Sequence, residues 1–417
     1  MALIPSSVFV RLDALHVRCM VIRLPEGLAT GTSLVMLAGV VALVVAGVEG
    51  SRDPLANPLP LFVWAVWWIG FTYLHAALGN WWAHVNPWIG LHRLLTSGGP
   101  LATWGRRPPL RYPPRAASWP AVAGLALFAW FELIYPAPLD PATLAGVVAG
   151  YVLGHVLAVL LFGPEWLGRA ETFSVFFRMV SRVSPFALRS SGLEVTAPAL
   201  NLLRAEAFDA SGVAFALLVL SAVSFDGLSR TFSWLALVGV NPLAYPGRTA
   251  LMLPNTLGLL GAFAVLGGAF VGAVALGAQL GGLRAGPGRL LGVFALAMVP
   301  IVCGYHFAHY LPVFLVDVQW ALRAASDPFA RGWNLLGTGG LHVVTSFLSD
   351  SARVYAVWHA QVGLIVAAHV AGVVVAHALA VRHTARRTVV AGQLPLLLLM
   401  IGYTVLGLWL LSTPSAG

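Results

Sequence analysis

Two histidines, His306 and His309, lie three residues apart in a mostly apolar stretch that reads CGYHFAHYLPVFLVDVQ from Cys303 to Gln319. Residues three apart share one face of a helix, so both imidazoles can act on one ligand. Imidazole is a general base near neutral pH and the commonest metal ligand in proteins. Pro312 removes the backbone donor for the carbonyl of residue 308, which predicts a kink or break in this helix. A broken helix at membrane depth usually lines a cavity.

Further polar side chains fall near the ends of apolar segments that should reach the same outer face. They are Glu132, Asp226, Asp317, Gln319, His359 and Gln361. A charged side chain inside a membrane costs several kcal/mol unless it is paired or hydrated, so each is a functional candidate.

Imidazoles and carboxylates together form the ligand set of zinc, iron, manganese or copper, and such a metal lowers the pKa of its bound water. We therefore expect His306, His309 and His359 as ligands of a divalent metal ion. Asp317, Glu132 and Asp226 are the expected catalytic carboxylates, as further ligands or as the base. The alternative is that these side chains only join helices by hydrogen bonds or ion pairs.

Four deeper histidines suggest a second arrangement. Counted from the outer helix ends, His155 and His369 lie about 18 and 21 Å deep, and His75 and His377 fall in the inner half. Two histidine pairs at two depths are typical of bis-histidine haems in membrane cytochromes. The sequence thus keeps open haem binding by His155, His369 and His377, against the alternative of packed, hydrogen-bonded histidines.

The composition indicates a membrane protein. Hydrophobic residues make up 59% of the 417 residues and charged residues only 9%, against roughly 25% charged in soluble domains. Cys19 and Cys303 give neither a disulfide framework nor a paired metal-ligand spacing. All 24 basic residues are arginine, and they lie in short loops between apolar segments, which favours orientation in a bilayer over nucleic-acid binding.

Nine apolar segments predict membrane spans. They cover residues 31–48, 59–79, 118–136, 143–163, 211–225, 254–282, 289–320, 355–382 and 393–412. With the N-terminus inside, 18 of the 24 arginines fall on inside segments, as the positive-inside rule requires. The seventh span would be about 47 Å long if continuous, so it must tilt, bend or project outward.

We therefore predict an all-α fold, a polytopic transmembrane helix bundle of about nine spans in a bacterial inner membrane. Residues 1–30 would form a cytoplasmic tail and residues 31–417 a single transmembrane domain. In residues 165–186, apolar side chains recur at helical spacing opposite Arg169, Arg178 and Arg182. This pattern predicts an amphipathic helix lying in the cytoplasmic interface.

Several stretches resemble a family of bacterial polytopic membrane proteins, the fenitrothion hydrolases. They include NPWIGLHRL at 86–94, FAWFELIYP at 128–136, FGPEWLGRAETFSVFFRMVSRVSPF at 162–186, SFDGLS at 224–229, HYLPVFLVDVQ at 309–319 and VGLIVAAHVAGVVVAHALAV at 362–381. The resemblance implies a membrane-bound phosphoric triester hydrolase that releases a nitrophenol from a small apolar organophosphorus ester. It implies no particular catalytic residue.

Two other functions stay open. One is a redox or metal-handling subunit with haem or copper, and the other is a small-solute transporter. A partner membrane subunit or a homo-oligomer is compatible with each of them.

The arginine distribution predicts that the loop 97–117 faces the cytoplasm and that the loop 321–354 faces outside. In intact spheroplasts, an impermeant thiol reagent should therefore label Gly337→Cys but not Ser97→Cys. The opposite labelling pattern would invert the orientation and place the candidate site on the cytoplasmic side.

Overall fold

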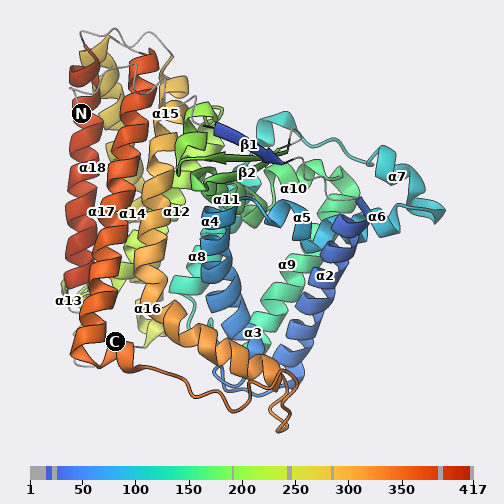
Figure 1. The fold of residues 1–417 in the computed structure, drawn as a ribbon. Coiled ribbons are helices and arrows are strands. Elements are labelled where there is room, and N and C mark those ends of the chain that lie inside the picture. The colour runs from blue at the N-terminus through green and yellow to red at the C-terminus, as the bar shows by residue number, and fades with distance from the viewer. Residues whose placement is uncertain are drawn as a thin grey trace.

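The chain is an all-α polytopic helix bundle in its computed structural model (Figure 1). The structure describes residues 16–20, 26–189, 192–241, 247–282, 286–383 and 388–413. Within these ranges, nine helical segments are long and apolar enough to cross a membrane. They are Gly27–Glu49, Pro58–Leu78, Pro114–Leu133, Pro141–Phe162, Ala210–Ser229, Arg248–Gly281, Pro287–Ser326, Ser351–Arg382 and Val389–Ser412. The nine predicted segments are thus confirmed as helical, with ends that differ by a few residues.

Seven of these segments are built around one long helix each, and the second and seventh are composite. The long helices are α2 (Glu26–Glu49), α8 (Trp119–Leu133), α9 (Pro141–Phe162), α12 (Ala210–Ser229), α14 (Arg248–Gly281), α17 (Ser351–His383) and α18 (Val389–Ser412). The second segment joins α3 (Pro58–Leu61), the π-helix η1 (Phe62–Gly70) and α4 (Phe71–Leu78). The seventh joins α15 (Pro287–Ala295), the 3₁₀-helix η7 (Leu296–Met298) and α16 (Val299–Ser326).

Figure 1 shows these helices as two groups. On one side stand α14, α17 and α18 with the first part of α16, and on the other side stand α2, α3 and α9. Between them lie α4 and α8, and α12 contacts both α8 and α14. Among the labelled helices, α16 extends from the first group toward the second, and its C-terminal part turns beneath α3.

The turn of α16 follows from Pro312, which lies inside the helix. Proline has no N–H, so the carbonyl of Ala308 lacks its usual helical donor. The side chain of Gln361 on α17 replaces that donor, with Nε2 2.7 Å from the Ala308 carbonyl oxygen. One residue earlier, the Tyr73 hydroxyl donates to the carbonyl of Phe307 at 3.2 Å. The predicted kink is therefore present, and neighbouring helices satisfy the backbone around it.

The segment 165–186 corrects one prediction. It forms two helices and a 3₁₀ turn, α10 (Glu165–Arg169), α11 (Thr172–Val180) and η4 (Ser181–Val183), instead of one continuous helix. The apolar face of α11 packs inside the bundle against α4, α8 and α16, and seven of its nine residues are buried. Arg178 and Arg182 are only half-exposed, and burial lowers the pKa of Arg182 to about 10.

Glu171 explains how α11 can begin inside the bundle. Its carboxylate is fully buried and accepts from the backbone N–H groups of Phe173 and Ser174 at 3.0 and 2.6 Å. Trp82 Nε1 donates to it at 3.1 Å, and the Tyr151 hydroxyl donates as well. The free N–H groups at the start of α11 therefore obtain an acceptor, and the buried carboxylate obtains donors.

A small sheet and several short helices complete the described chain. The sheet has the order β1-β3-β2 and is antiparallel, with β1 (His16–Met20), β2 (Phe186–Arg189) and β3 (Gly192–Thr196). Part of the predicted tail thus pairs with the loop that follows α11. The short helices are α5 (Trp82–Val85), α6 (Pro87–Leu95), η2 (Gly99–Leu101), α7 (Ala102–Arg106), η3 (Pro114–Ala116), η5 (Leu200–Arg204), α13 (Phe232–Leu237) and η8 (Ser346–Leu348).

The substitution Gln361→Met tests the support of the α16 bend. It keeps the side-chain length but leaves the buried Ala308 carbonyl without its donor, which should lower the free energy of unfolding by about 1–3 kcal/mol. Unfolding of the purified protein in mixed micelles measures this. Gln319→Met is the control, because Gln319 donates to Leu315 and Val344 in a more exposed position. Equal stability of the Gln361 variant and wild type would contradict this role of Gln361.

Candidate functional site

The bend of α16 lies beside an ion-paired histidine. His309 Nε2 is 2.6 Å from Asp226 Oδ2, and Arg230 contacts the other carboxylate oxygen, Oδ1, through Nη2 at 2.8 Å and Nε at 3.0 Å. The side chain of Asp226 is 3% exposed, that of His309 25% and that of Arg230 53%. The Asp226 carboxylate raises the pKa of Arg230. A buried acid thus holds a histidine and an arginine that both reach toward the surface.

The next residue of α16 binds a second acid. The Tyr310 hydroxyl donates to Glu132 Oε1 on α8 at 2.9 Å. Arg248, the first residue of α14, donates through Nη1 to the backbone carbonyls of Glu132 and Tyr135 at 2.9 and 3.2 Å. Four helices, α8, α12, α14 and α16, therefore contribute to one acid–base cluster, which we define as Glu132, Asp226, Arg230, Arg248, His309 and Tyr310.

His306 lies one turn before this cluster and is fully buried. Its ring stands edge-on to Trp68 of η1, with the centroids 4.7 Å apart, and contacts Tyr310 at 4.8 Å. Phe176 of α11 packs on another side of the ring at 6.1 Å. Among the described residues, neither nitrogen of His306 nor Trp68 Nε1 has a hydrogen-bond partner. Unpaired buried polar atoms are rare and indicate a functional position or a bound water molecule.

A narrow pocket adjoins the cluster between η1, α8, α12 and α16. Most of its lining is apolar, and its polar atoms come from Trp68, Glu132 and Tyr310. It has room for about one water molecule. The π-helical geometry of η1 matters here, since π-helical segments are uncommon and occur frequently at functional sites.

The structure therefore brings together Glu132, Asp226 and His309, with His306 beside them. It does not bring Asp317 and His359 to the cluster. Asp317 lies on α16 about 12 Å beyond His309 at 1.5 Å per residue. His359 is exposed on α17, where its Nδ1 contacts the carbonyl of Tyr355 at 2.7 Å.

The candidate metal ligands do not converge. Across the described ranges, no three His, Cys, Asp or Glu side chains lie close enough to hold one metal ion. The Nε2 atom of His309 contacts Asp226, and His359 is exposed with its Nδ1 on the Tyr355 carbonyl of its own helix. The geometry therefore supports an acid–base interpretation of the cluster better than a three-ligand metal centre.

The deeper histidines have separate surroundings. His75 uses both nitrogens, with Nδ1 2.6 Å from the Phe71 carbonyl and Nε2 accepting from the Trp82 N–H at 2.9 Å. His155 on α9 accepts from Trp166 Nε1 at 3.0 Å. His369 and His377 lie on α17, on the opposite side of the bundle from α9 (Figure 1). The structure does not pair His155 with His369 or leave His75 a nitrogen for iron.

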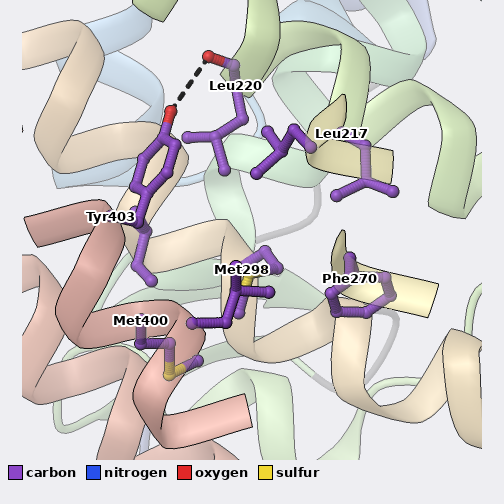
Figure 2. A pocket seen from close by; sticks show the side chains of 9 residues that line it. Leu217, Leu220, Phe270, Met298, Met400 and Tyr403 are labelled. Carbon is purple, nitrogen blue, oxygen red and sulfur yellow. Dashed lines mark hydrogen bonds between the residues drawn. The ribbon is translucent and has the colours of Figure 1, made fainter. Parts of the chain in front are cut away.

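His377 instead contacts the neighbouring helix α18, and His369 contacts the backbone of its own helix. Nδ1 of His377 is 2.8 Å from Gln393 Oε1, and Nδ1 of His369 is 2.8 Å from the Ile365 carbonyl. A second pocket lies nearby, between α12, α14, α18 and the junction of η7 with α16. Figure 2 shows its apolar lining, where Tyr403 turns its hydroxyl away from Met298 and Met400 and donates to the Leu220 carbonyl at 3.1 Å.

Four residues of the site were not among the sequence candidates: Arg230, Arg248, Tyr310 and Trp68. In the sequence, Arg230 and Arg248 are only two of the 24 arginines whose distribution indicates the orientation of the chain in a bilayer. A signal existed for Arg230, because it follows Asp226 by four residues, the spacing of a helical ion pair. Tyr310 directly follows His309, but only the packing of α8 on α12 and α16 brings it to Glu132.

No family model, curated protein or solved structure matches this chain. The fold and the site by themselves define the class, a multi-pass α-helical membrane protein with a buried acid–base cluster near one end of its helices.

A double-mutant cycle with Asp226→Ala and His309→Ala tests the central ion pair. The two substitutions should be coupled by about 0.5–3 kcal/mol in unfolding free energy, because the side chains contact each other in a mostly buried place. The exposed pair Glu165 and Arg169, with Oε1 and Nε 3.1 Å apart, is the control and should show about 0.3–0.5 kcal/mol. Additive effects of the Asp226 and His309 substitutions would mean that the contact is not energetically significant.

Proposed function

We propose that this protein is a membrane-bound hydrolase of apolar organophosphorus esters in which His309, oriented by Asp226, is the general base. The single observation that supports this is the contact between His309 Nε2 and Asp226 Oδ2 at 2.6 Å. A carboxylate on one imidazole nitrogen fixes the tautomer and stabilises the imidazolium that forms when the other nitrogen takes a proton. The resemblance to the fenitrothion hydrolases supports the choice of substrate.

In this mechanism, Nδ1 of His309 removes a proton from a water molecule as that water attacks phosphorus. The new bond joins the water oxygen to phosphorus, and the bond to the ester oxygen breaks with its electron pair. A nitrophenolate leaving group is stable near neutral pH and needs no proton at that moment. The proton on His309 then passes to solvent.

Arg230 and Arg248 provide the positive charge for this step. Both are exposed beside the buried acids, and negative charge develops on the phosphoryl oxygen or sulfur in the transition state. Guanidinium groups bind such oxygens well because their N–H donors match the spacing of a phosphate. A fixed donor at the developing charge is usually worth a few kcal/mol.

A neutral phosphotriester partitions into lipid, so a site at the ends of membrane helices suits its approach. We place the protein in a bacterial inner membrane with this site at the outer face, on the arginine distribution. A divalent metal ion stays part of the hypothesis only as an additional group, since no reaction step here requires it. A chelator that abolishes turnover would favour the metal-assisted variant.

Turnover of a 4-nitrophenyl phosphotriester by the detergent-purified protein tests the proposal. His309→Ala should reduce turnover by about 100-fold or more, because the general base is lost. Asp226→Asn should also reduce it, because the imidazole loses its orienting charge. His359→Ala is the matched control, a histidine near the same end of the bundle that is outside the cluster, and it should keep near-normal turnover. Equal loss in the His309 and His359 variants would favour shared metal ligation, and unchanged turnover in the His309 variant would reject the proposed base.

A further inference from the structure

The narrow pocket beside the cluster has the properties of a binding site for one water molecule. A buried water typically needs two to four polar partners and enough volume for one probe sphere. The pocket has that room, and three of its lining residues, Trp68, Glu132 and Tyr310, carry polar atoms. The remaining lining comes from apolar side chains of α8 and α12, which would keep other water molecules out.

Trp68 supplies the observation that points to a ligand. It is 4% exposed, and its Nε1 is buried without a hydrogen-bond partner among the described residues. An unmet buried donor destabilises the folded protein, and a water molecule that accepts from Nε1 would remove that cost. The Tyr310 hydroxyl hydrogen already forms a hydrogen bond with Glu132 Oε1. The other partners for that water are therefore the hydroxyl oxygen of Tyr310 and the second carboxyl oxygen of Glu132.

The two acids of the cluster have different neighbours. Asp226 contacts two cationic or protonatable groups, His309 and Arg230. The carboxyl of Glu132 accepts from a phenol, and no cationic side chain of the described chain lies within ion-pair distance of it. Two carboxyls with such different surroundings commonly divide the roles of base and acid in hydrolases.

We propose that Trp68, Tyr310 and Glu132 hold one water molecule, and that Glu132 passes a proton through it to the departing ester oxygen. This inference rests on the proposed function and names the substrate class of that site. Esters of unactivated phenols and alcohols, whose leaving oxygen must be protonated, would be substrates in addition to nitrophenyl esters. Glu132 is the proton donor, and Trp68 and Tyr310 are positioning residues.

The step balances in protons and electrons. His309 takes one proton from the attacking water, and the bond from phosphorus to the leaving oxygen breaks with its electron pair on that oxygen. The oxygen takes the proton that Glu132 supplies, so the products are the phosphoric diester and a neutral phenol or alcohol. Glu132 is protonated again from solvent, and His309 returns its proton to solvent.

Two substrates that differ only in the nitro group of the leaving phenol test the role of Glu132 as proton donor. They are dimethyl 4-nitrophenyl phosphate and dimethyl phenyl phosphate. Glu132→Gln should slow hydrolysis of the phenyl ester by about 100-fold or more, the range of lost general acid catalysis. It should slow hydrolysis of the nitrophenyl ester by less than about 10-fold, because nitrophenolate leaves without a proton. Glu165→Gln, an exposed acid outside the cluster, should change neither rate.

Trp68→Phe gives a second test that leaves every carboxyl in place. It keeps an aromatic ring against His306 but removes the indole N–H, and it should show the same selective loss on the phenyl ester. Trp64→Phe is its matched control on the same π-helix, because Trp64 Nε1 donates to the Pro138 carbonyl at 3.2 Å and lies outside the pocket lining.

The outcomes separate the two proposals. Selective loss on the phenyl ester in both variants supports the proton donor. Equal slowing of both esters, or no slowing of either, overturns the proton donor while wild-type turnover still supports the hydrolase. Wild-type protein without activity on either ester overturns the hydrolase and the proton donor together.

Discussion

The site depends on one constraint, the missing N–H of Pro312 inside α16. The carbonyl of Ala308 must find another donor, and Gln361 on α17 provides it at 2.7 Å. The helix can therefore bend inside the bundle without an unsatisfied backbone group. Just before the bend, α16 presents His306 to η1, His309 to α12 and Tyr310 to α8. One bent helix thus meets three neighbours within five residues.

The spans could be predicted because a bilayer demands about 20 apolar residues for each crossing, a signal that needs no tertiary information. The convergence of Glu132, Asp226 and His309 could also be anticipated. Glu132 and Asp226 lie near the ends of apolar segments that reach the face toward which the part of the seventh segment with His309 runs, and polar residues at membrane depth gain from pairing with one another. The depth of a residue in the membrane follows from its position along the apolar segment, whereas the direction in which its side chain faces around the helix axis also depends on packing. Rotation about the helix axis explains His359, whose side chain is exposed on α17, whereas Asp317 lies outside the cluster because it is about 12 Å further along α16 than His309.

The burial of α11 could not be predicted for a related reason. An amphipathic pattern says that one face needs an apolar cover, but lipid and protein cover it equally well. The deciding contact is between Glu171 and the donors Trp82 and Tyr151, which are 89 and 20 residues away. Arg230 was likewise counted as a charge that orients the chain, and the same guanidinium holds Asp226. The sequence identifies charged residues such as Glu171 and Arg230, but only the packing of the helices determines which groups they contact.

The acid–base cluster also joins helices. Asp226 and His309 link α12 to α16, and Glu132 and Tyr310 link α8 to α16. A ligand that hydrogen bonds with any of these side chains therefore exchanges one partner for another instead of meeting unoccupied groups. Its net affinity is the difference between the bonds it makes and the interhelical bonds it displaces. Ligand binding and the loosening of α16 against its neighbours are therefore coupled, because the same hydrogen bonds are exchanged in both.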